Sequence, residues 1–254
     1  MTIPYAFSAM PVKLLIVEDH VLVRELLDIA CQQALPRAEV RAAGSAQDAL
    51  KECARAAPDV VLLDLVLPDG DGLALLPGIF ARAPEARVIA LSSRINEVTL
   101  HRALGSRVHG IIDKNEQPIK TLGEAIATVM TGGQYLSAAV RRLRASMKAD
   151  PRAFDKILSD REQEALRLIG EGMSNEEVAE RLGISANTAK NHRLNIMAKL
   201  EIHSTPQLIR YAIEKGFTRV YEDGTVARRK QPGGLKPQLA FQAGGLTEIK
   251  VKPG

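Results

Sequence analysis

The sequence contains little cysteine and no long apolar run. Cys31 and Cys53 are the two cysteines among 254 residues, and their spacing matches no metal-binding or redox motif. This pattern excludes a disulfide-stapled protein and favours a reduced, cytoplasmic one. No apolar run approaches the roughly 18 residues of a membrane span, and the N-terminus lacks the charged stretch and apolar core of a secretory signal. We therefore expect a cytoplasmic protein without a membrane segment.

Signatures of several enzyme classes are missing as well. The sequence has no Walker A loop, no Cys/His set with metal-ligand spacing and no internal repeat. No motif of a substrate pocket is visible either. We therefore do not expect an enzyme that turns over a small molecule.

The charge of the chain differs between its two parts. Residues 1–136 hold 13 basic and 16 acidic side chains, whereas residues 137–254 hold 21 and 14. An acidic front and a basic back favour two domains with different partners. Residues 157–217 are nevertheless nearly neutral, with 8 basic and 9 acidic side chains. Net charge alone therefore does not establish binding to nucleic acid.

The front part alternates short apolar runs with helical patterns. Continuous apolar runs of this kind are typical of strands buried on both faces of a parallel sheet. Five strand–helix units in about 125 residues predict an α/β doubly wound, five-stranded parallel sheet. The expected strands are 13–18, 39–43 (the weakest), 58–64, 87–92 and 110–113, and the expected helices are 21–34, 46–57, 73–83, 97–104 and 119–131.

Polar side chains stand at the carboxyl ends of these strands, where such folds bind ligands. Crowded carboxylates repel one another unless a cation neutralises them, and a hard oxygen cluster with an open side suits Mg²⁺. A carboxylate beside such an ion can act as a nucleophile and form an aspartyl phosphate. Taken singly, each of these residues has a simpler interpretation as a solvated acid, a loop cap or a surface lysine. The residues are Glu18, Asp19, Asp64, Ser92 and Lys114.

The segments Leu15–Glu25 and Asp64–Gly72 resemble the receiver domain of two-component response regulators of the NarL/FixJ type. The resemblance covers residues 10–134. It implies that Asp64 is the phosphoacceptor and that Ser92 and Lys114 contact the phosphoryl group. It also implies a Mg²⁺ site made by Glu18 through water, Asp19, Asp64 and the carbonyl of Val66.

The sequence departs from the receiver pattern in three places, one of which is the absence of a proline after Lys114. Ile111 stands where the family often has an aromatic residue that moves inward on phosphorylation, and Arg107 stands where it usually has glycine. We therefore expect intact phosphorylation chemistry but an altered switch at Ile111. Activity that does not depend on phosphorylation remains an alternative.

The back part predicts a compact unit of four helices over residues 157–217. Ser159 and Ser174 each precede a glutamate by three residues, which is a capping-box pattern, and Gly183 marks a tight turn. On the third helix, 186–200, apolar residues gather on one side. The opposite side is polar and free of acids, as a helix that reads the major groove requires. A helix with a merely solvated polar face is the simpler alternative.

The strings Leu158–Glu162, Gly172–Ala179 and Ile184–His192 strongly resemble the LuxR-type DNA-binding domain. The resemblance implies a helix-turn-helix whose third helix enters the major groove and whose fourth helix forms a dimer. Its candidate DNA-binding residues are Asn187, Thr188, Lys190, Asn191, Arg193, Leu194 and Lys199. Its candidate dimerisation residues are Leu208, Ile209, Ala212 and Ile213.

We expect residues 135–156 to form a helical linker that ends near Pro151. We expect residues 218–254, which are rich in Gly, Pro and basic residues, to be a disordered tail.

Together the patterns indicate a DNA-binding response regulator that a sensor histidine kinase phosphorylates at Asp64. We expect a homodimer on two DNA half-sites. The alternatives are a signalling adaptor that binds proteins and a regulator that acts without phosphorylation.

Overall fold

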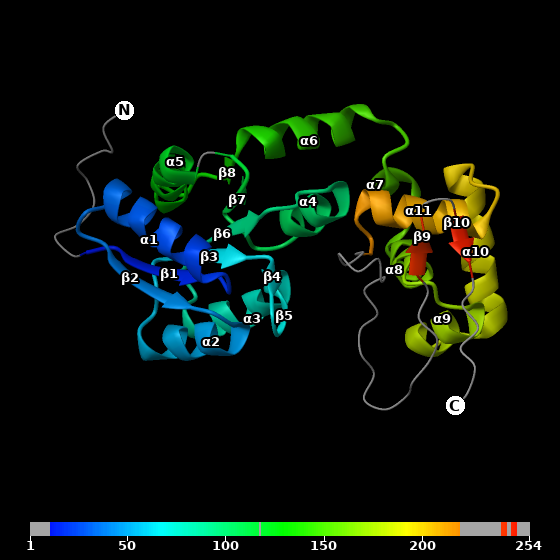
Figure 1. Ribbon diagram of the computed structural model, residues 1–254, viewed down its shortest axis with the longest axis horizontal. Coiled ribbons are helices and arrows are strands. Elements are labelled where there is room, and N and C mark those ends of the chain that lie inside the picture. Colours follow the sequence, from blue (N-terminus) through cyan, green and yellow to red (C-terminus); the bar gives the residue numbers. More distant parts are fainter. Residues whose placement is uncertain (1–10, 117, 219–239, 243–244, 248–254) are drawn as a thin grey trace. The chain divides into compact units, whose positions relative to one another are not determined.

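The computed structural model describes residues 11–116, 118–218, 240–242 and 245–247 (Figure 1). The chain divides into two compact units, residues 1–95 with 99–146 and residues 96–98 with 147–254. The main division falls between Ser146 and Met147, inside the segment predicted to be the linker.

The first unit is the predicted doubly wound α/β domain. Its sheet has the order β2-β1-β3-β6-β7-β8, and every neighbouring pair is parallel. The elements of this unit are β1 (Lys13–Val17), α1 (Val21–Ala34), β2 (Glu39–Ala43), α2 (Ala46–Arg55), β3 (Val60–Asp64), β4 (Val66–Leu67), β5 (Gly70–Asp71), α3 (Gly72–Arg82), β6 (Arg87–Ser92), α4 (Glu97–Leu104), β7 (Gly110–Asp113), α5 (Pro118–Met130), β8 (Tyr135–Leu136) and α6 (Ala138–Ala149).

The sheet has six strands in place of the predicted five. The extra strand β8 contains two residues, which pair with Gly110 and Ile111 of β7. A run this short carries no periodicity of its own, so only its position beside β7 defines it as a strand. The weakly predicted strand over 39–43 is confirmed as β2.

One core cluster of this unit lies between the sheet and the pair α1 and α5, which share one face of it, while α2 and α3 lie on the other face (Figure 1). The side chain of Cys31 belongs to this core and is fully buried. Burial, together with the nearby Asp28 carboxylate, raises the pKa of the Cys31 thiol to about 12. Cys31 therefore acts as a small apolar residue of the core.

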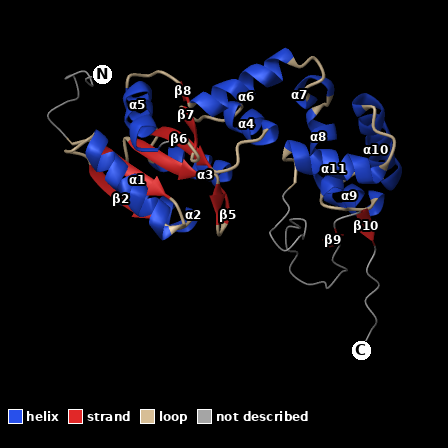
Figure 2. Cartoon of the chain, turned by 45° about the horizontal axis from the view of Figure 1, so that its top comes forward, coloured by secondary structure: helices blue, strands red, loops and turns tan. Residues whose placement is uncertain are grey.

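The second unit is helical between residues 154 and 215 (Figure 2). Its helices are α7 (Phe154–Ile157), which the sequence did not predict, and α8 (Asp160–Gly170), α9 (Asn175–Leu182), α10 (Ala186–Leu200) and α11 (Thr205–Lys215). Both predicted capping boxes are present, at Ser159 and at Ser174. Gly183 ends α9 with a φ of 65°, a left-handed conformation that glycine adopts without a steric cost.

Close contact between α8 and α11 shapes this unit. A Cβ atom on Gly170 would lie 2.7 Å from the Cβ of Ala212, so glycine at this point allows the two helices to approach. Phe154 and Phe217 add an edge-to-face ring contact with centroids 4.9 Å apart.

The prediction that residues 218–254 are disordered is wrong for six residues, those of β9 (Ala240–Gln242) and β10 (Gly245–Thr247). These residues form an antiparallel pair in which Phe241 stands opposite Leu246. Apart from Thr218, the rest of the tail, including the basic segment Arg228–Lys230, lies outside the described residues.

His109 makes the first unit sensitive to acid. Its Nδ1 accepts a hydrogen bond of 3.0 Å from the amide of Val88, so the neutral ring carries its proton on Nε2. Burial, and then the positive charges of Arg87 and Arg107, lower the pKa of His109 from its ordinary value of 6.5. The unfolded chain therefore binds a proton at a higher pH than the folded chain does.

We expect the free energy of unfolding of the first unit to fall as the pH drops below about 6.5 and to go on falling towards the depressed pKa of His109. A His109→Gln variant should lose most of this dependence, because its side chain does not titrate. Urea denaturation at pH 7.5 and 5.5 measures the difference. The exposed His203→Gln variant is the control, and equal pH slopes in His109→Gln and in the unaltered protein would contradict the assignment.

Candidate phosphoacceptor site and nucleic-acid interface

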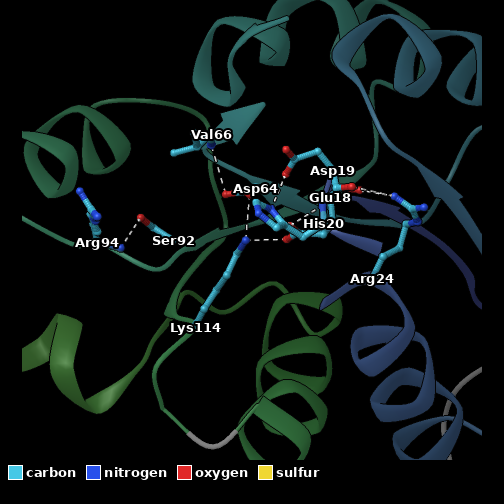
Figure 3. Close-up of polar contacts among 9 residues, drawn as sticks. All are labelled: Glu18, Asp19, His20, Arg24, Asp64, Val66, Ser92, Arg94 and Lys114. Atoms are coloured by element: carbon cyan, nitrogen blue, oxygen red, sulfur yellow. Dashed lines mark hydrogen bonds and ion pairs between the residues drawn. The ribbon is translucent and has the colours of Figure 1, made fainter. Parts of the chain in front are cut away.

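The ends of three strands bring the predicted acidic pocket together (Figure 3). Glu18 and Asp19 follow β1, Asp64 is the last residue of β3, and Lys114 follows β7. Because β1 and β3 are neighbours and all strands of the sheet run in the same direction, these ends lie at one edge of the sheet. Of the five residues expected to meet at this edge, which also include Asp19 and Ser92, Glu18, Asp64 and Lys114 are in direct contact.

Lys114 is the central contact of this pocket. Its Nζ lies 2.8 Å from Oδ2 of Asp64 and 2.5 Å from Oε2 of Glu18. The side chains of Glu18 and Asp64 are buried, and that of Lys114 is only 16% exposed. Two carboxylates removed from water require a neutralising charge, and a single ammonium group is shared between them.

The donor set of the pocket fits a hard divalent cation. Glu18, Asp19 and Asp64 supply three carboxylates, against which Lys114 supplies one positive charge. Ligand atoms of Glu18, Asp19 and His20 lie within 4.8 Å of one another. Oxygen donors with an excess of negative charge are the chemistry that Mg²⁺ prefers.

Two neighbours of the pocket escaped the sequence analysis. Nδ1 of His20 lies 3.0 Å from Oδ1 of Asp19, although the ring itself is exposed. Arg24 donates a hydrogen bond of 2.7 Å to the carbonyl of Glu18 and so holds the turn after β1. The available signal was their position: His20 directly follows the two acids, and Arg24 stands in the first turn of the helix that comes next.

The turn after Asp64 is held from two sides. Val66 donates its amide to Oδ1 of Asp64 over 3.1 Å, and it pairs with Asp71 in the short hairpin of β4 and β5. Asp69 accepts hydrogen bonds from the amides of residues 46 and 47 at the start of α2. Asp71 lies 2.5 Å from Arg102 of α4. The loop that follows Asp64 is therefore attached to both α2 and α4.

Ser92 and Ile111 lie at the expected strand positions. Ser92 ends β6 beside Asp113, and its buried hydroxyl accepts a hydrogen bond of 3.2 Å from the amide of Arg94. Ile111 is fully buried in β7, between Ala90 and Leu136 of the adjacent strands. Their roles in switching stay predictions.

The predicted two faces of α10 are observed. Ala189 and Ile196 are buried. Leu194, 52% exposed, lies on the outer face with Asn195, which the sequence analysis did not select although it stands four residues after Asn191. The other exposed candidates are Asn187, Thr188, Lys190, Asn191 and Lys199.

Two predicted DNA-binding cations make contacts inside the domain. Arg193 donates to Oδ1 of Asn175 at 2.8 Å and to the carbonyl of Met173 at 2.9 Å, and burial lowers its pKa. Lys199 lies 2.7 Å from Glu162, which also closes the capping box of α8. These contacts attach α10 to α8 and α9, and the contact of Arg193 or Lys199 with DNA stays a prediction.

The predicted dimerisation face on α11 requires a correction. Leu208 and Ala212 are fully buried within the domain, and Ala212 packs against Gly170 of α8. Leu208 and Ala212 therefore belong to the face of α11 that packs inside the domain, which explains their helical spacing. Ile209 and Ile213 are partly exposed and stay candidates.

Two family models match the chain. The model described as "Response regulator receiver domain" matches residues 14–126, and the model described as "Bacterial regulatory proteins, luxR family" matches residues 156–212. The response regulator protein VraR of Staphylococcus saprophyticus is 32% identical over 206 residues, which cover 81% of this chain and 98% of VraR. The oxygen regulatory protein NreC of Staphylococcus epidermidis is 32% identical over 216 residues, covering 80% and 97%.

Solved structures of RcsB are similar along nearly the same length. A structure of RcsB from Salmonella typhimurium is 26% identical with a TM-score of 0.54, over 80% of this chain and 98% of that one. An RcsB–DNA complex is 26% identical with a TM-score of 0.57, covering 79% and 97%. This chain belongs to the response regulators that join a receiver domain to a LuxR-type DNA-binding domain.

The match to the luxR family disfavours the alternative of an adaptor that binds only proteins. Among the described residues, no helix is both long enough and apolar enough to span a bilayer.

Gly72 leaves room for the backbone of Asp64. A Cβ atom at this position would lie 2.1 Å from the carbonyl oxygen of Asp64 and 2.9 Å from Cα of Leu65. Backbone atoms of a buried strand end cannot move aside cheaply, in contrast to the tip of a flexible side chain.

We expect Gly72→Ala to lower the free energy of unfolding by about 1–3 kcal/mol, the usual cost of overpacking. It should also slow phosphorylation of Asp64, because Asp64 must shift. Urea denaturation and labelling by a small phosphodonor measure the two effects. Gly105→Ala is the matched control, since the nearest atom to its Cβ would be at 3.4 Å. Equal stability of the two variants would refute the steric argument.

Proposed function

We propose that a sensor histidine kinase phosphorylates Asp64 and that the phosphorylated chain acts in the cytoplasm as a dimeric transcription regulator on DNA. The contact of Lys114 with both Asp64 and Glu18 is the observation that carries the proposal. The domains we assign are residues 10–134 and 157–217, joined by residues 135–156. The chain's own chemistry is limited to transfer at Asp64, without turnover of a small molecule.

The transfer follows from the geometry of the pocket. A carboxylate oxygen of Asp64 attacks the phosphorus of a phosphohistidine; the O–P bond forms as the N–P bond breaks, and its electron pair stays on the imidazole. The ammonium group of Lys114, already beside Oδ2, then contacts the phosphoryl oxygens. The hydroxyl of Ser92 turns from the amide of Arg94 towards the same group.

Mg²⁺ would be held by Asp19, Asp64, the carbonyl of Val66 and, through water, Glu18. Bound there, it supplies positive charge that offsets the charge of the carboxylates and of the transferred group. The three carboxylates support this assignment, because the one lysine at the pocket, Lys114, contacts only Glu18 and Asp64.

The outer face of α10 is proposed to read bases in the major groove. Lys190 and Asn191 are exposed there, and lysine donates to guanine while asparagine pairs with adenine. An RcsB structure described as bound to the rprA promoter, in the presence of the phosphomimetic BeF3-, is 26% identical with a TM-score of 0.57, covering 79% of this chain and 98% of that one. We propose the same kind of contact here, with two copies on two half-sites.

Asp64→Asn should abolish labelling by acetyl phosphate in the presence of Mg²⁺, because the amide is not a nucleophile. Labelling is measured by the mass of the intact protein. Asp59→Asn is the control: Asp59 is exposed near the opposite end of the same strand and accepts a hydrogen bond from the amide of Lys13. Full labelling of Asp64→Asn would place the phosphoacceptor elsewhere.

Lys190→Ala and Asn191→Ala should each weaken binding to a specific promoter by about 1–3 kcal/mol if they read bases. If Lys190 contacts a phosphate instead, the salt dependence of binding should fall by about one unit of slope. Fluorescence anisotropy at several salt concentrations separates the two results. Arg210→Ala, an exposed cation on α11, is the control, and unchanged binding by both variants would rule out the outer face of α10.

A further inference from the structure

The loop after β7 has contacts on two sides. On one side Lys114 reaches the acidic pocket, and its amide donates a hydrogen bond of 2.8 Å to the carbonyl of Ser92. Two residues later, the side chain of Glu116 points to a different element, the start of α6. Residues 113–116 thus lie between the phosphoacceptor and the helix that leads out of the first unit.

Glu116 caps α6. Its Oε1 accepts a hydrogen bond of 2.5 Å from the amide of Ala139, in the first turn of α6, and lies 3.7 Å from Arg142. Although burial opposes ionisation, hydrogen bonds from the hydroxyl of Ser137 and the amide of Ala139 hold the pKa of Glu116 below its ordinary value. A carboxylate at this position satisfies a free amide and complements the positive end of the helix dipole.

A second set of hydrogen bonds joins the same two segments. Ser137, immediately before α6, is fully buried. Its hydroxyl accepts a hydrogen bond of 3.2 Å from the amide of Asp113, and its own amide donates to the carbonyl of Ile111 over 3.0 Å. The start of α6 is therefore tied to β7 and to the loop that carries Lys114.

The other end of α6 is held within the second unit. Nζ of Lys156 lies 3.1, 2.8 and 2.6 Å from the carbonyl oxygens of Met147, Lys148 and Asp150, where it satisfies the end of the helix. The boundary between the units falls between Ser146 and Met147, so α6 begins in the first unit and ends in the second.

We propose that Glu116 is a positioning residue that couples the pocket around Asp64 to α6. When Lys114 leaves Glu18 to contact a phosphoryl group, the loop moves and the hydrogen bond from Ala139 to Glu116 is strained or lost. Hydrogen bonds weaken steeply with distance and angle, so a small shift of the loop suffices. The first turn of α6 then loosens. The inference rests on the proposed phosphorylation of Asp64.

The position of Ile111 is consistent with this route. Ile111 is aliphatic and fully buried, so it has no polar ring atom with which to transmit a change to the surface. Lys114, in contrast, contacts the phosphoacceptor directly and is separated from Glu116 by one residue.

Hydrogen exchange of the full chain, with and without Mg²⁺ and beryllofluoride, tests the coupling. In the unaltered protein, beryllofluoride should speed exchange of the amides in the first turn of α6 by roughly threefold or more, the low end for loss of an N-terminal cap. In Glu116→Ala these amides should exchange fast in both conditions. Glu116→Gln, which keeps an acceptor oxygen, should retain the response, and so should the control Glu85→Ala, in an exposed turn.

Binding of beryllofluoride is followed separately by fluorine NMR, so that two failures can be told apart. If the unaltered protein does not bind beryllofluoride, both the proposed phosphorylation and the coupling are wrong. If it binds but the first turn of α6 does not respond, or Glu116→Ala responds as the unaltered protein does, the coupling alone is wrong. Should Glu116→Ala not fold, Glu116→Asp, whose carboxylate is one methylene shorter, gives the same test.

Discussion

The first unit depends on one ammonium group placed between two buried carboxylates. Glu18 and Asp64 come from different strands, and without Lys114 their mutual repulsion and their loss of hydration would oppose closure of this edge of the sheet. The same three residues belong to the pocket in which we propose that the phosphoryl transfer takes place. The proposed phosphoryl group at Asp64 would add negative charge beside the ammonium group of Lys114, which already lies between two carboxylates.

The loops around this pocket are the parts of the first unit through which the proposed change of charge at Asp64 would reach other elements. The hairpin after Asp64 is bound to α2 through Asp69 and to α4 through Asp71, and the loop of Lys114 is bound to α6 through Glu116. Each attachment is a carboxylate that accepts hydrogen bonds from a helix start or from an arginine. Such charge-assisted contacts are directional, so they either hold or break with small displacements.

The helical unit divides its charged side chains between two tasks. Arg193 and the partly exposed Lys199 make contacts within the domain, where they hold α10 against α9 and α8. Serine caps define where the helices begin. Lys190 and the exposed asparagines remain on the outer face. A helix that presents amides and a single lysine can discriminate between bases, whereas a uniformly basic face would bind any polyanion.

Local patterns in the sequence determined the strands, the longer helices and the capping boxes, because periodicity and capping are local properties. The meeting of Glu18, Asp64 and Lys114 at one edge was predictable for a different reason: strands joined through helices run parallel, so their carboxyl ends share an edge of the sheet. Local patterns did not determine β8 or α7, which are too short to show a period. Only the tertiary structure decided which side of α11 is inward, that Arg193 and Lys199 contact their own domain, and that Glu116 reaches α6. Each of these three contacts depends on which residue, distant in the sequence, lies next to the side chain, and the packing of the helices decides that.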